Sequence, residues 1–165
     1  MDESTENYIR QAIDGHIHDG NWAQQVNFTN LFGYTEPVNV TSATIATTGN
    51  TDAYLIAPRT LTAFQIDFSG LDALAASDTN YITWTITNLG QAGSGTAAFL
   101  AATAANTTKV TGGSAIVANT RRTLTPTSTL IDLQVVQGDR IRIRAAVTGT
   151  LANTVTFPVY LLNFN

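Results

Sequence analysis

The chain contains no cysteine among its 165 residues, and this absence excludes both a disulfide framework and thiol chemistry. Charged residues are also scarce, at 12%, whereas 44% of the residues are hydrophobic. Disordered segments have the opposite composition, because they cannot bury enough apolar surface to fold. The length suits one domain with a core of its own.

Long hydrophobic runs and an excess of basic residues are missing as well. No run of about 18 apolar residues is present, so we expect no membrane span. The opening sequence MDESTENYIR lacks the basic start and the apolar stretch of a secretory signal. The net charge is −4, with 8 basic and 12 acidic residues. This balance disfavours nucleic acid and anionic membranes as partners, because both select a basic surface.

Threonine, valine and isoleucine are abundant, and β-branched residues favour pleated sheets over helices. From residue 38 onward, short apolar alternations recur between turn signals, which is typical of a sandwich or barrel. About eight or nine short strands predict an all-β fold, most simply a jelly-roll-like β-sandwich over residues 38–165. The predicted strands are Val38–Thr47, Ala53–Ala57, Leu61–Phe68, Tyr81–Asn88, Ser114–Ala118, Arg122–Thr125, Ile131–Val135, Arg140–Val147 and Val155–Leu162. The alanine-rich run TAAFLAATAA fits either a short helix or a strand.

Strict alternation identifies which side chains should enter the core, because successive strand residues point to opposite faces. We expect four inward rows, and Pro158 should mark an edge or a bulge because it cannot donate to a ladder. The rows are Ile82, Trp84 and Ile86; Ile141, Ile143 and Ala145; Phe64, Ile66 and Phe68; and Val155, Phe157, Val159 and Leu161.

Residues 1–37 differ from the rest and predict an extended or partly helical N-terminal arm. Residues 1–36 carry six acids and one base, a net charge of −5, whereas the remainder carries six acids and seven bases, a net charge of +1. The segment after residue 20 is too apolar for a free linker. Its side chains, Trp22 and Phe28 among them, are therefore expected to pack on the body of the protein or on a neighbouring chain.

Both histidines lie in the segment DGHIHDGNW, two residues apart. In an extended segment His16 and His18 would point to the same side and could reach one metal ion. Two imidazoles make a poor site, but three chains on a symmetry axis would supply six, enough for a transition metal in octahedral geometry. The alternative is that both are ordinary loop histidines ahead of an Asp-Gly turn.

A second candidate site is the outward row Arg140, Arg142 and Arg144, which alternates with the inward residues of the same strand. These arginines form either a solvated strand face or an interface that pairs with the acidic arm of a neighbouring subunit. Arginine suits the second role, because its planar fork matches carboxylates. Exposed aromatic residues that could stack on sugars include Trp22, Tyr34, Tyr54 and Tyr160, but the sequence does not cluster them.

Catalytic constellations are not evident in the sequence. The sequence contains no G-x-S-x-G motif, the elbow that would present the serine of a Ser-His-Asp triad. The Gly-rich segment GQAGSGTA lacks the lysine of a phosphate-binding loop. A metal motif of the cupin type would need a glutamate soon after His18 and a third histidine. Paired carboxylates, as in glycoside hydrolases, stay open at this point.

The segment Gly15-His16-Ile17-His18-Asp19-Gly20 resembles the H-x-H-D-G stretch found near the start of many tailed-bacteriophage virion proteins. These include tail-fibre, head-fibre and capsid-decoration proteins. The segments LTAFQIDF, NYITWTITNLG and LQVVQGDRIRIRAAVTGT resemble strands of the jelly-roll domains that such proteins carry. The resemblance implies a homotrimeric, non-enzymatic virion component, and it carries the family's metal role to His16 and His18.

The chain departs from the fibre pattern because it passes directly into one compact domain, without a long shaft. This points to a capsid decoration (cement) protein or a short head fibre on the outer surface of the capsid head. Its expected partners are two further copies of itself and the major capsid protein or other virion proteins. One alternative is a tail-fibre or receptor-binding protein whose sandwich recognises host surface glycans. Another is a stand-alone enzyme or sugar-binding module.

Overall fold

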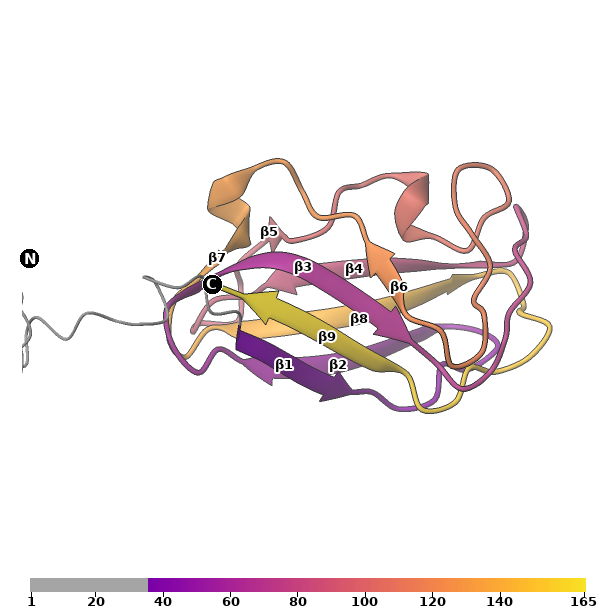
Figure 1. Cartoon of the computed structure of the whole chain (residues 1–165), viewed down its shortest axis with the longest axis horizontal. Coiled ribbons are helices and arrows are strands. Elements are labelled where there is room, and N and C mark those ends of the chain that lie inside the picture. Colours follow the sequence, from indigo (N-terminus) through magenta and orange to yellow (C-terminus); the bar gives the residue numbers. More distant parts are fainter. Residues whose placement is uncertain (1–35) are drawn as a thin grey trace, which may run out of the picture. The chain divides into compact units, whose positions relative to one another are not determined.

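The computed structural model describes residues 36–165, and residues 1–35 lie outside the described part (Figure 1). The nine strands of the described part are connected by turns and two short 3₁₀ helices. The strands are β1 (Glu36–Thr41), β2 (Asn50–Ile56), β3 (Leu61–Ser69), β4 (Tyr81–Asn88), β5 (Ala97–Ala98), β6 (Arg122–Leu124), β7 (Gln134–Val135), β8 (Arg140–Thr148) and β9 (Val159–Phe164). The 3₁₀ helices are η2 (Ala104–Asn106) and η3 (Leu130–Leu133). No helix in residues 36–165 is long and apolar enough to cross a membrane.

The strands form two antiparallel sheets that face each other, as predicted. One sheet has the order β1-β9-β3-β6, with β7 added at the start of β3, and the other has the order β2-β8-β4-β5 (Figure 1). The pairs β1–β9, β2–β8, β3–β6 and β4–β5 are all antiparallel. The first four strands therefore pair in reverse order with later ones, like a long hairpin folded over on itself. This connectivity is that of a jelly roll.

The core lies between the sheets and draws on every long strand. Two of the predicted inward rows are confirmed, because Ile82, Trp84 and Ile86 on β4 are fully buried, as are the three alternating residues of β8. Trp84 packs against Phe68 of the opposite sheet, with 4.8 Å between the ring centroids. The ring of Tyr160, opposite Phe68 on the neighbouring strand β9, lies 5.4 Å from the Phe68 ring. The contact between Phe68 and Trp84 joins the two sheets.

The predicted core row on β3 is wrong at its first residue. Ile66 and Phe68 are buried, but the side chain of Phe64 is 39% exposed. The cause is a β-bulge, because Ala63 pairs with Phe164 and Gln65 with Asn163, which leaves Phe64 without an opposite residue. The sequence carries no proline or glycine at this point that would have indicated the bulge.

The predicted row on the last strand is also wrong after Val155. Phe157 is exposed, and the buried residues of β9 are Tyr160, Leu162 and Phe164. Phe157 has φ = +45°, and β9 begins only after Pro158, so the alternation that ends at Val155 does not continue into β9. The sequence predicts an edge or a bulge at Pro158, but Pro158 lies just before β9, which pairs with strands on both sides. Tyr160 is consequently a core residue and is no candidate for stacking on a sugar.

Other segments also depart from the predicted strands, and β1 ends at Thr41 rather than at Thr47. The predicted strand at 131–135 is mostly η3, and only its last two residues form β7. Residues 114–118 contribute a single bridge from Ile116 to Leu74. The alanine-rich run, for which the sequence leaves a short helix and a strand both open, contains one of each: it begins with the strand β5 and ends in the 3₁₀ helix η2.

Candidate interaction surface

The predicted arginine row lies on the outer face of the second sheet. Because Ile141, Ile143 and Ala145 fill the core, Arg140, Arg142 and Arg144 of the same strand point outward. β8 is flanked by β2 and β4, so the row runs along the middle of the sheet. We call the outward side chains of β2, β8 and β4 the outer face.

One of the three arginines is paired within its own chain. Nε and Nη2 of Arg144 each donate a hydrogen bond of 2.7 Å to a carboxylate oxygen of Asp52, which lies opposite on β2. Such a forked pair is short and strongly oriented. The hydrogen bonds from Arg144 hold the pKa of Asp52 below its ordinary value, and the charge of Arg142 acts in the same direction. Arg144 therefore links β8 to β2 within the sheet.

Arg140 and Arg142 have no acidic partner among residues 36–165. Arg140 is exposed beside Ile56 of β2, and Arg142 lies opposite Tyr54. Tyr54 and Ile56 are both more than half exposed. The Nε atom of Arg142 is buried and has no hydrogen-bond partner in the described part of the chain. The outer face thus presents two cationic side chains next to two exposed apolar ones.

A groove with a volume of about 390 Å³ lies along the free edge of β4. It forms because the ladder beside β4 is interrupted. The backbone N–H of Phe99 donates to the carbonyl of Ile86, and that of Thr108 donates to the carbonyl of Ile82. Between these two contacts residues 100–106 leave the edge of β4 and arch outward.

The groove has an apolar wall and one charged end. Lys109 lies over the ring of Tyr81 at the start of β4, with Nζ 4.4 Å from the ring centroid. Thr83 and Thr85 contribute outward side chains of β4 to the floor. The wall comes from small and aliphatic residues: Ala98, Leu100, Ala101, Ala102 and Ala104.

A buried asparagine holds the arch in place. Nδ2 of Asn106 donates to the carbonyls of Ala101 and Thr125, both at 2.8 Å, and Oδ1 accepts from the backbone N–H of Thr125 at 2.7 Å. All the polar atoms of this amide are therefore used. Sequence reasoning missed Asn106, because nothing in the local pattern distinguishes it from the other asparagines.

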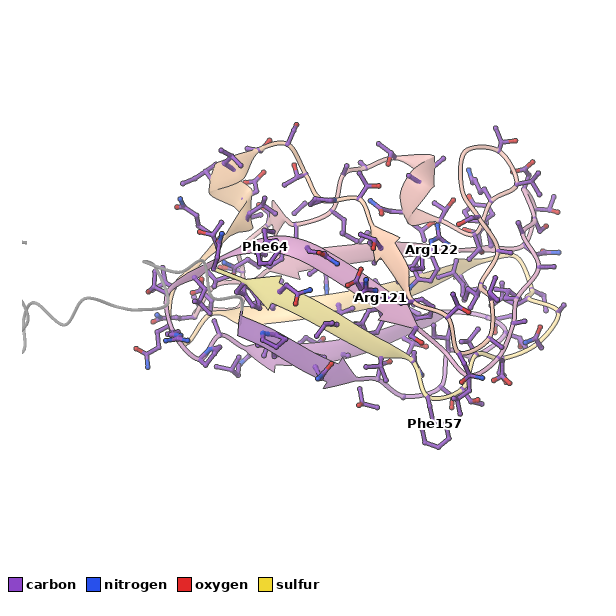
Figure 2. All side chains as sticks on the ribbon, in the orientation of Figure 1. Phe64, Arg121, Arg122 and Phe157 are labelled. Atoms are coloured by element: carbon purple, nitrogen blue, oxygen red, sulfur yellow. The ribbon has the colours of Figure 1, made fainter. Side chains whose placement is uncertain are left out.

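Arg122 of β6 is the second residue that sequence reasoning missed. Its guanidinium donates to the carbonyls of Ser114, Ala105 and Thr107 at 2.8, 2.7 and 2.6 Å. Its Cζ lies 4.8 Å from the ring centroid of Trp84, a cation–π contact with a core residue. Arg122 thus fastens the segment 104–116 to the sandwich, whereas its neighbour Arg121 is largely exposed (Figure 2).

Two carboxylates of the described part, those of Asp72 and Asp78, stabilise turns. Asp72 accepts from the hydroxyl and backbone N–H of Thr156, and Asp78 accepts from the same two groups of Thr111. These hydrogen bonds lower the pKa of both aspartates. A catalytic acid at neutral pH needs the opposite, a raised pKa. Asp72 and Asp78 therefore stay ionised at neutral pH and stabilise turns.

The remaining predicted site residues lie outside the described residues. These are His16, His18, Trp22 and Phe28, so the metal site and the packing of the arm stay predictions from sequence. Within residues 36–165 no group of three or more histidine, aspartate or glutamate side chains is placed to hold a metal ion.

No protein-family model matches the chain, and no curated protein matches it either. The solved structures of the Gt and Gx strains of infectious bursal disease virus are similar to this chain. The Gt match has a TM-score of 0.30 and 13% identity, and the Gx match has a TM-score of 0.29 and 14% identity. Each match covers 79% of this chain but only 36% of the viral chain.

Proposed function

We propose that the chain is a non-enzymatic virion structural protein, a trimeric capsid decoration or head-fibre protein that binds the head shell through residues 1–37. The observation that carries the proposal is the strand order β1-β9-β3-β6 over β2-β8-β4-β5, a complete jelly roll of the kind used in capsid proteins. Many unrelated proteins share this fold, so fold alone does not assign a role. The resemblance of residues 15–20 to virion proteins adds the second, independent support.

The division of charge supports binding through the arm. Residues 1–36 carry a net charge of −5, whereas the sandwich after them carries +1. β1 begins at Glu36, so residues 1–35 join the sandwich at the end where β1 starts and β9 finishes. In the proposed arrangement that end faces the shell, and the turns at the opposite end project outward.

The receptor-binding alternative has less support from the described residues. A glycan site would be expected to gather exposed tryptophan or tyrosine side chains at loop tips. The exposed large aromatic residues in the described part are Tyr54, Phe64 and Phe157, and they lie on β2, at the bulge of β3 and in the turn before β9. These three places do not form one platform.

Deleting residues 1–36 tests the proposal. The described part has a core of its own, drawn from residues 40–164, so we expect the truncated protein to fold. Circular dichroism and thermal unfolding would check this. In co-sedimentation with particles stripped of the protein, the full chain should bind, and the truncated chain should not. A folded truncated protein that binds the shell with the same affinity as the full chain would refute the proposal.

A further inference from the structure

Phe157 is an exposed aromatic residue in a backbone conformation that costs free energy. Its side chain is 66% exposed, and its φ of +45° lies in the left-handed region that residues with a Cβ rarely adopt. In Figure 2 the ring projects beyond the ribbon on the side of β1 and β9. Strain at an exposed apolar side chain stabilises nothing within the monomer, so the conformation calls for another explanation.

The residues around Phe157 hold it rigidly in this position. Thr156 donates two hydrogen bonds to Asp72, and its carbonyl accepts from the backbone N–H of Leu71. On the other side, the carbonyl of Pro158 accepts from the backbone N–H of Ser42 at 2.9 Å. The ring is thus presented on a fixed turn. A presented aromatic side chain of this kind is suited to anchor an interface.

The chain also carries a groove that suits a phenyl ring. The groove along β4 is walled by alanines and Leu100 and has a volume of about 390 Å³. A cavity of about 150 Å³ is enough to hold benzene. The groove borders β5, η2 and the segment toward β6, whereas Phe157 projects on the β1 side, so the two features occupy opposite flanks of the sandwich (Figures 1 and 2).

The small size of the contact indicates which occupant it fits. A phenylalanine side chain buries roughly 150–250 Å² when it is fully covered, whereas a stable pair of proteins needs about 800 Å² on each partner. Phe157 alone therefore cannot hold a free partner. It can act between copies that are already held side by side, where the effective concentration is high.

We propose that Phe157 of one copy inserts into the β4 groove of the next copy. The contact is head-to-tail, because the two surfaces differ, and such contacts close into a ring when the rotation between copies permits. The inference rests on the proposed trimer and specifies one of its contacts. Each copy then contributes one aromatic anchor and one groove.

Photo-crosslinking of the full chain tests the contact directly. A benzophenone amino acid at position 157 keeps an aromatic side chain there, and a mixture of isotopically light and heavy chains identifies adducts between copies. We expect adducts from position 157 to residues 98–109 of another copy. The same probe at Leu130, which is also exposed, serves as the control: η3 contacts β5, so it can label residues near 98 of its own chain, but it should give no adduct to that segment of another copy.

Two substitutions test the energetics of the same contact by sedimentation. Phe157→Ala removes the anchor and Ala102→Trp fills the groove, and each should weaken association at least about 30-fold, as for an interface hot spot. The double variant should be little worse than either single one. Val117→Ala truncates another exposed apolar residue and should leave association unchanged.

The outcomes separate this inference from the proposed function. A stable trimer whose adducts from position 157 lie elsewhere, or that tolerates both substitutions, would overturn the head-to-tail contact alone. A wild-type chain that stays monomeric at all concentrations would overturn both this contact and the proposed trimer. Adducts in residues 98–109 together with weakened association in both variants would support the contact.

Discussion

Replacing Arg122 by alanine should be one of the most damaging changes outside the apolar core. The variant loses three hydrogen bonds from a charged donor and the contact with Trp84. A hydrogen bond to a charged group contributes about 1.5–3 kcal/mol, and water can replace part of it at exposed carbonyls. We therefore expect a loss of about 3 kcal/mol in the free energy of unfolding. For a domain of this size that corresponds to a fall in Tm of roughly 10 °C.

The adjacent arginine provides a matched control. The Arg121 side chain is 65% exposed and lies 3.7 Å from a carboxylate oxygen of Asp67. The carboxylate of Asp67 is buried, but it also accepts hydrogen bonds from Gln65 and Thr123. Loss of the long contact to an exposed guanidinium should therefore cost only about 1 kcal/mol, and Arg121→Ala should have a small effect. Urea unfolding of both variants measures the difference. Arg122→Lys should recover only part of the loss, because one ammonium cannot bridge three carbonyls. If Arg122→Ala and Arg121→Ala are equally mild, the assignment of Arg122 as a fastening residue is wrong.

Three further predictions concern the groove and the turns. Asn106→Asp keeps the shape of the side chain, but a carboxylate cannot donate to the two carbonyls. We therefore expect the free energy of unfolding, measured in urea, to fall by about 2 kcal/mol or more. An unchanged unfolding midpoint would contradict this. The lowered pKa values of Asp72 and Asp78 mean that the folded state binds protons less readily than the unfolded state. Their contribution to stability is therefore fully present above their unfolded pKa of about 4 and is lost as the pH falls through the lower folded values. The Tm should be constant from pH 7 to 5 and should fall below pH 4. A fall in Tm already at pH 6 would point to other groups. Gly149→Ala should lower the Tm clearly more than Gly90→Ala. Both glycines have positive φ, but only at Gly149 would a Cβ collide with Asn80. Equal Tm values for the two variants would refute this explanation.

The parts of the fold that could be predicted from sequence are those governed by strict alternation. β4 begins and ends where expected, because Ile82, Trp84 and Ile86 alternate with polar residues and Leu89-Gly90 ends the strand. The arginines of β8 point outward for the same reason. Burial of one face fixes which residues point inward wherever nothing interrupts the pleat.

The parts that could not be predicted depend on interruptions and on contacts between distant residues. The bulge at Phe64 changes which residues of β3 point inward and has no local sequence signal. At Phe157 the following proline indicates that the strand is interrupted, but not the left-handed backbone that leaves this side chain outside the core. The groove requires the chain to leave β4 after residue 99 and to be held by Asn106 through bonds to residue 125. Such partners are set by the tertiary fold, so periodicity cannot reveal them.

Electron microscopy of particles from the source, labelled with gold through an antibody to the recombinant protein, would show whether the protein decorates the capsid head. As a control, the antibody should be absorbed with the purified protein before labelling. We predict gold spread evenly over the capsid heads. Gold confined to the tail tip would contradict the decoration role and favour adsorption to the host. Particles without any gold would contradict a virion role altogether.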